Sequence, residues 1–177
     1  MEQENVLSID WKLVATKIFQ LSIFVTLAVV APYFGNQLIT GSLVNALLFI
    51  SVTTMGVESA FLLCLIPSLI SMYTGLLPLA LSPMVLFIMT GNALLVLTFW
   101  KLVNPSTLLR AGNFWFGAVS ASIIKFVFIW CAGILLANSV LHGVASKVML
   151  MVSWPQLVTA LSGACLAFLF LKIIKKI

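Results

Sequence analysis

Lys125 is the residue of this chain with the most chemistry to account for. It stands near the middle of a long apolar run, 113–138. A charged side chain at the centre of a bilayer costs at least about 2.5–3.5 kcal/mol, so it needs a partner. Lys125 could anchor an anionic or carbonyl-bearing ligand. Alternatively, it could form an ion pair with Glu58 or extend its amine toward a membrane interface.

Two asparagines in other apolar runs are further candidates. Asn45 and Asn92 lie in segments that share a Thr-Gly pair followed by Asn-Ala-Leu-Leu, and these segments begin at Thr40 and Thr90. An amide among apolar residues must be hydrogen-bonded, so each asparagine could simply join helices, at about 0.6–2 kcal/mol per bond. The alternative is contact with a ligand.

Residues 153–159, Ser-Trp-Pro-Gln-Leu-Val-Thr, form the most distinctive polar and aromatic cluster. Pro155 has no backbone N–H, so it should free a carbonyl and bend the helix. Gln156 and Thr159 fall on one helix face, and Trp154 adds a large flat surface that would suit a small planar ligand. Equally, Trp154 could be an interfacial tryptophan beside a tolerated proline.

Together these residues predict an external pocket between helices. Its aromatic faces would stack on the ligand, its amides would orient the ligand, and Lys125 would counter an acidic or polarised group. The expected substrate-binding residues are Tyr33, Asn36, Asn45, Asn92, Lys125, Trp154 and Gln156.

The elements that must position these residues are membrane helices. Of the 177 residues, 63% are hydrophobic, nine are basic and four are acidic, which leaves too little polar surface for a soluble globule. At about 20 residues per span, the chain has room for a compact all-α bundle of six transmembrane helices in a single domain, 1–177. The expected spans are 13–30, 38–55, 57–72, 79–100, 113–138 and 148–171.

The basic residues predict the orientation. With six spans, seven of them flank the side that carries both termini, and only Lys147 flanks the other. This asymmetry favours cytoplasmic termini in a bacterial cytoplasmic membrane. The first apolar run continues too far for a cleaved signal peptide, so we expect it to be retained.

The sequence lacks the residue patterns that nucleic-acid binding, metal binding and catalysis require. The basic residues are spread singly and form no nucleic-acid-binding face. The three cysteines, Cys64, Cys131 and Cys165, lie in apolar runs without a metal-binding spacing, and His142 has no acidic neighbour. We expect no enzyme activity, no cofactor and no metal site.

The layout and three segments resemble the substrate-specific S component of energy-coupling factor transporters. The segments begin at Thr40 (Thr-Gly-Ser-Leu-Val-Asn-Ala), Thr90 (Thr-Gly-Asn) and Ser153 (Ser-Trp-Pro-Gln-Leu-Val-Thr-Ala). The resemblance implies capture of a vitamin or other micronutrient from outside. It also implies a transmembrane coupling protein and two cytoplasmic ATPases as partners, and toppling in the membrane to release the cargo.

Three residues are candidates for the partner interface. S components often carry Ala-x-x-x-Ala in the first helix for docking, whereas Ala28 and Ala31 here are three residues apart. Glu58 is expected in the first turn of the third span. There the helix dipole favours a carboxylate by about 0.3–1 kcal/mol, and the alternative is contact with a partner subunit.

Two other functions are compatible with the composition. The chain could be a structural or assembly subunit of a cell-envelope membrane complex, with polar residues that mainly join helices. A small channel or lipid-handling protein is less favoured, because the sequence has no ring of repeated charge and no polar stripe.

Overall fold

The computed structural model describes residues 11–103, 111–139 and 149–177. Within these residues the fold is all-helical and contains no strand. Two short 3₁₀ turns, η1 (Ala31–Phe34) and η2 (Leu79–Leu81), precede α2 and α4. The helices are α1 (Trp11–Val30), α2 (Gln37–Thr54), α3 (Val57–Tyr73), α4 (Met84–Leu102), α5 (Ala111–Ser139) and α7 (Trp154–Ile173).

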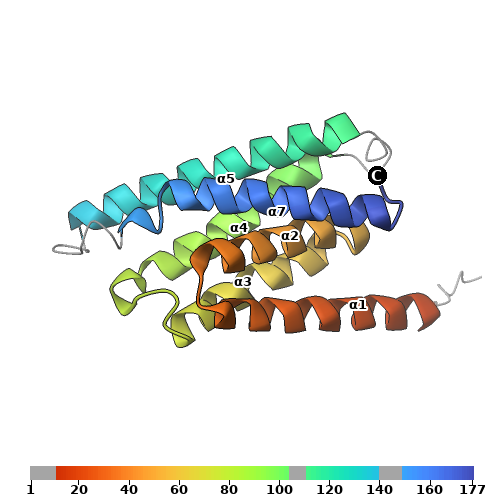
Figure 1. Ribbon diagram of the computed structural model, residues 1–177, viewed down its shortest axis with the longest axis horizontal. Coiled ribbons are helices and arrows are strands. Elements are labelled where there is room, and N and C mark those ends of the chain that lie inside the picture. Colours follow the sequence, from red (N-terminus) through yellow and green to blue (C-terminus); the bar gives the residue numbers. More distant parts are fainter. Residues whose placement is uncertain (1–10, 104–110, 140–148) are drawn as a thin grey trace, which may run out of the picture.

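The six helices run along one common axis and alternate in direction (Figure 1). The most extensive helix pairs are α2 with α7 and α4 with α5, and α3 packs against α4. Helix α1 lies at the edge of the bundle, where it contacts mainly α3 and η1. The centre of the bundle is therefore built by α2, α3, α4, α5 and α7.

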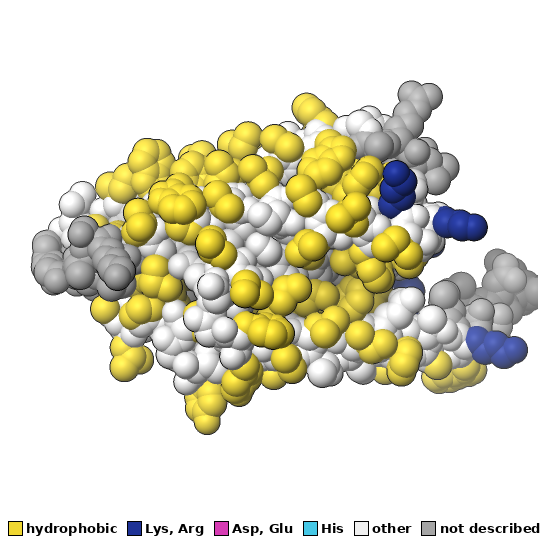
Figure 2. Space-filling view, in the orientation of Figure 1, with side chains coloured by type: hydrophobic (Ala, Val, Ile, Leu, Met, Phe, Trp, Pro, Cys, Tyr) yellow, Lys and Arg dark blue, Asp and Glu magenta, His cyan; other side chains and the backbone are white. Residues whose placement is uncertain are grey.

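The outer surface of the bundle suits a membrane. Five helices (α1, α2, α4, α5 and α7) are long and apolar enough to span a bilayer, and α3 is an apolar helix of 17 residues. Hydrophobic side chains cover much of the face in Figure 2, and the lysine side chains drawn on it gather at the end where the C-terminus lies. The sequence prediction of a multi-pass helical membrane protein is thus confirmed in this form.

The helix starts that differ most from the expected spans are those of α4 and α7: α4 begins at Met84 rather than at 79, because Leu79–Leu81 form η2, and α7 begins at Trp154 rather than at 148. Helix α2 begins at Gln37, one residue before the expected start at 38, and the Asn36 side chain caps it by accepting hydrogen bonds from the backbone N–H of Leu38 (2.9 Å) and Ile39 (3.3 Å). Helix α7 begins only at Trp154, so Pro155 lies in its first turn. Among the described residues 149–171, a turn at 151–153 takes the place of the predicted kinked helix, and a proline in the first turn of α7 removes no bond that this helix would otherwise make.

Small residues let α2 and α7 approach closely. A Cβ atom added to Gly163 would lie 2.6 Å from Asn45 Cβ and 2.8 Å from the backbone nitrogen of Ala46. One added to Gly41 would lie 2.8 Å from a methyl carbon of Thr159. The two backbones meet here because neither glycine carries a side chain, as in other membrane helix pairs.

Aromatic residues fill the half of the bundle near the C-terminus. Phe99 of α4 packs 4.9 Å from Phe49 of α2 and 5.4 Å from Phe114 of α5, measured between ring centroids. Phe168 of α7 packs 5.5 Å from Phe114. These four rings join four helices, and we call them the aromatic cluster.

Candidate functional site

Lys125 lies inside the bundle with its amine bound to two helices. The side chain is 2% exposed, and its Nζ atom donates to Asn45 Oδ1 at 2.6 Å and to Asn92 Oδ1 at 2.7 Å. The amine therefore links α5 to both α2 and α4. Two of the three ammonium N–H groups are satisfied in this way, and the third has no protein acceptor among the described residues.

The two asparagines are held from their other side. Asn92 Nδ2 donates to the backbone carbonyl of Cys64 at 3.3 Å, and Asn45 Nδ2 makes a long contact of 3.5 Å to Thr159 Oγ1. Both amides thus direct their oxygens at Lys125. The repeated Thr-Gly and Asn pattern has a spatial counterpart, because Asn45 and Asn92 meet at one amine.

The predicted alternative of a Lys125–Glu58 ion pair was wrong. Glu58 is exposed in the first turn of α3, and both hydrogen bonds of Lys125 go to asparagines. The other three acidic residues belong to 1–10, outside the described residues. The described part of the bundle therefore gives the Lys125 amine no counter-charge.

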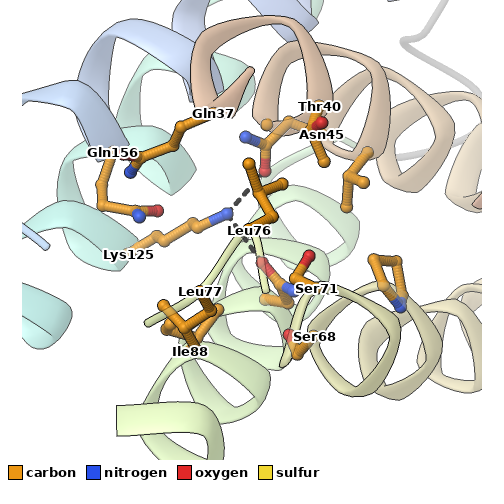
Figure 3. Close-up of a pocket in the computed structure, with 14 residues that line it drawn as sticks. Gln37, Thr40, Asn45, Ser68, Ser71, Leu76, Leu77, Ile88, Lys125 and Gln156 are labelled. Carbon is orange, nitrogen blue, oxygen red and sulfur yellow. Dashed lines mark hydrogen bonds between the residues drawn. The ribbon is translucent and has the colours of Figure 1, made fainter. Parts of the chain in front are cut away.

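A small cavity adjoins this amine. It has a volume of about 90 Å³ and is bounded by α2, α3, α4, α5, α7 and the connection between α3 and α4. Figure 3 shows Lys125 entering from α5, with Gln37 and Gln156 on one side and Ser68 and Ser71 on the other. Leu76, Leu77 and Ile88 supply an apolar wall.

The backbone carbonyl of Met151 holds the two glutamines that line the cavity. Met151 lies in the turn that precedes α7, so its carbonyl oxygen is available to side chains. It accepts from Gln37 Nε2 at 2.5 Å and from Gln156 Nε2 at 3.1 Å. This turn stands where the sequence predicted a proline-kinked helix, and the Met151 oxygen joins the start of α2 to the start of α7.

The sequence did not single out two serines at the cavity. Ser68 is 5% exposed, and neither its hydroxyl nor that of Ser71 makes a hydrogen bond within the described residues. Both lie close to Pro67 on α3 and line the cavity. The signal that could have found them is the three-residue spacing of Ser68 and Ser71, which places both hydroxyls on one helix face.

Three predicted site residues lie elsewhere. Trp154 is 52% exposed at the start of α7, and Tyr33 is 63% exposed and lines a separate hollow with Tyr73. The Asn36 side chain is engaged as the cap of α2. None of these three lines the cavity at Lys125, so the structure does not bring the predicted aromatic faces to it.

The predicted interface residues divide in the same way. Ala28 and Ala31 are each 1% exposed and belong to the chain's own core, where Thr40 Oγ1 donates to the Ala31 carbonyl at 2.8 Å. Other parts of the chain cover both alanines, so the structure presents neither of them to a partner subunit. Glu58 stays exposed and available to a partner.

The described residues contain no group of three His, Cys, Asp or Glu side chains that could hold a metal ion. The cavity instead offers an amine, amides and hydroxyls, which bind a polar solute by hydrogen bonds. His142, Arg110 and Lys147 lie outside the described residues. In comparisons with known proteins, no family model, no curated protein and no solved structure matches the chain.

Proposed function

We propose that this protein is a membrane-embedded solute-binding subunit, which takes up a small polar solute and works with a coupling protein and ATPases. The observation that carries the proposal is the buried Lys125 amine beside a cavity between five helices. An ionisable group at membrane depth that faces a cavity is typical of a substrate or ion path. Energy would come from partner subunits, as the resemblance to S components implies.

The position of the cavity supports uptake from outside. Its lining residues lie toward the starts of α2, α4 and α7 and the end of α3. This half of the bundle is the one away from the end at which the lysines gather in Figure 2. The positive-inside rule would place that lysine-bearing end in the cytoplasm. The proposed topology has six spans, with α3 as the shortest, and the cavity in the outer half of the membrane.

A structural role is the second candidate. The hydrogen bonds from Lys125 to Asn45 and Asn92 join three helices, which a scaffold subunit of an envelope complex would also need. Helix joining alone would not require an unpaired N–H on the amine or an unpartnered Ser68 hydroxyl beside it. These two unused donors favour solute binding over the scaffold.

Native mass spectrometry of the gently solubilised full chain tests the proposal. We expect a bound small molecule on the wild type, its loss in Lys125→Met, and its retention in Lys101→Met, which removes an exposed lysine at the end of α4. Circular dichroism checks that each variant is folded. A stoichiometric envelope protein with no small molecule on the wild type would instead support the scaffold.

A further inference from the structure

We propose that the cavity at Lys125 binds a small monocarboxylate with a short alkyl chain. This inference rests on the proposed function and names the substrate class of the same site. It predicts that the carboxylate oxygens meet the Lys125 amine and the hydroxyls of α3, while the alkyl chain lies against Leu76, Leu77 and Ile88. Charge, donor arrangement, wall chemistry and volume support it.

Charge selects an anion. Lys125 is the one ionisable side chain among those that line the cavity, and both groups bound to it are neutral amides. In a site of low dielectric an uncompensated amine attracts a negative group much more strongly than it would in water. A single lysine balances one negative charge, so a monoanion fits better than a dianion or a cation.

The unused hydrogen-bond donors select an oxygen acid. The third N–H of Lys125 and the hydroxyls of Ser68 and Ser71 have no acceptor within the described residues. Figure 3 places the two serines and the lysine on different sides of the same cavity. A carboxylate presents two oxygens with about four acceptor positions, so one such group could satisfy all three donors.

The volume and the opposite wall limit the rest of the ligand. Drug-sized ligands occupy pockets of about 300–1,000 Å³, whereas this cavity has about 90 Å³. This volume exceeds the roughly 10–15 Å³ that a single water needs, so the cavity has room for a small solute. The apolar wall of Leu76, Leu77 and Ile88 then favours a chain of a few carbons over a second polar group.

Isothermal titration of the purified full chain tests this with defined probes. We expect propionate to bind at least about tenfold more tightly than propionamide, which has the same size but no charge. Benzoate should bind more weakly than propionate because of its size. Lys125→Met and Ser68→Ala should each weaken propionate binding by about tenfold or more, since each removes a donor to a charged ligand.

Ser51→Ala is the matched control for Ser68→Ala. Ser51 also has a buried hydroxyl without a hydrogen bond, but it does not line the cavity, so propionate binding should stay unchanged. Ser68→Ala keeps Lys125 in place and covers the case in which Lys125→Met fails to fold. Equal binding of propionate and propionamide would overturn the inference, as would full propionate binding by Ser68→Ala.

The two proposals fail in different ways. If a larger co-purified molecule binds and depends on Lys125 while propionate does not bind, the monocarboxylate is wrong and the solute-binding function stands. If neither a co-purified molecule nor any probe binds to the folded wild type, both are wrong.

Discussion

The two halves of the bundle use the same helices for opposite purposes. In the half near the C-terminus, rings from α2, α4, α5 and α7 interlock around Phe114, which is 0% exposed. In the other half these helices, together with α3, surround a cavity and present an amine, amides and hydroxyls to it. Packed rings therefore stabilise one half of the bundle, and the other half has room for a solute.

Each half of the bundle contains a serine hydroxyl without a hydrogen bond among the described residues, and the two differ in what surrounds them. Ser51, on the same helix as Phe49, is fully buried without a hydrogen bond and does not line the cavity. Ser68, on α3, also lacks a partner but lines the cavity. A buried hydroxyl without a bond costs free energy in either place, but only at Ser68 can a bound solute recover it.

The largest effect on stability is expected at Phe114. Phe114→Ala would leave a hole between four helices, which costs about 3–5 kcal/mol in soluble cores and less here, because lipid is as apolar as the protein interior. Phe116→Ala on the same helix removes a ring that is 65% exposed and should have little effect. Unfolding in SDS followed by circular dichroism would measure both. Equal losses in the two variants would contradict a special role for the aromatic cluster.

A smaller loss is expected at Gly163, where α2 and α7 meet between the halves. Gly163→Ala would place a methyl group against the backbone of Ala46, and such overpacking costs about 1–3 kcal/mol. Gly112→Ala on α5 has no atom within 4 Å of the new Cβ and should be neutral or slightly stabilising. The same SDS titration compares them. A fully stable Gly163→Ala would mean that the two helices can separate freely.

The smallest effect is expected at the glutamines of the cavity half. Gln37→Leu or Gln156→Leu alone leaves the Met151 carbonyl one donor, so each should cost no more than about 0.6–2 kcal/mol. The double variant leaves that carbonyl bare and should lose more than the sum of the two. Strict additivity in a double-mutant cycle would show that the two bonds are independent.

Much of the fold could be predicted from the sequence because apolar length alone specifies membrane helices. The ends were harder to predict, since they depend on local bonds. Asn36 caps α2 and lengthens it toward the cavity, whereas Pro155 marks where α7 starts. In each case one side chain or one missing N–H decided the boundary.

The site could be predicted where a residue has a high free-energy cost of burial in the membrane. A charged or amide side chain raises the free energy of inserting a helix into lipid. The structure brings together the three such residues that the sequence singled out, Lys125, Asn45 and Asn92. An aromatic side chain at a helix end carries no such free-energy cost, and both Trp154 and Tyr33 lie at the surface. Ser68 and Ser71 were missed because serine is common in membrane helices and reveals its role only through the cavity beside it.

The link from Lys125 to two asparagines also bears on how the chain is made. Both acceptors, Asn45 and Asn92, precede the lysine in the sequence. A chain synthesised from its N-terminus therefore has α2 and α4 available before α5 emerges. The segment that is hardest to place in the bilayer is produced after the groups that accommodate it, so the order of residues suits co-translational assembly.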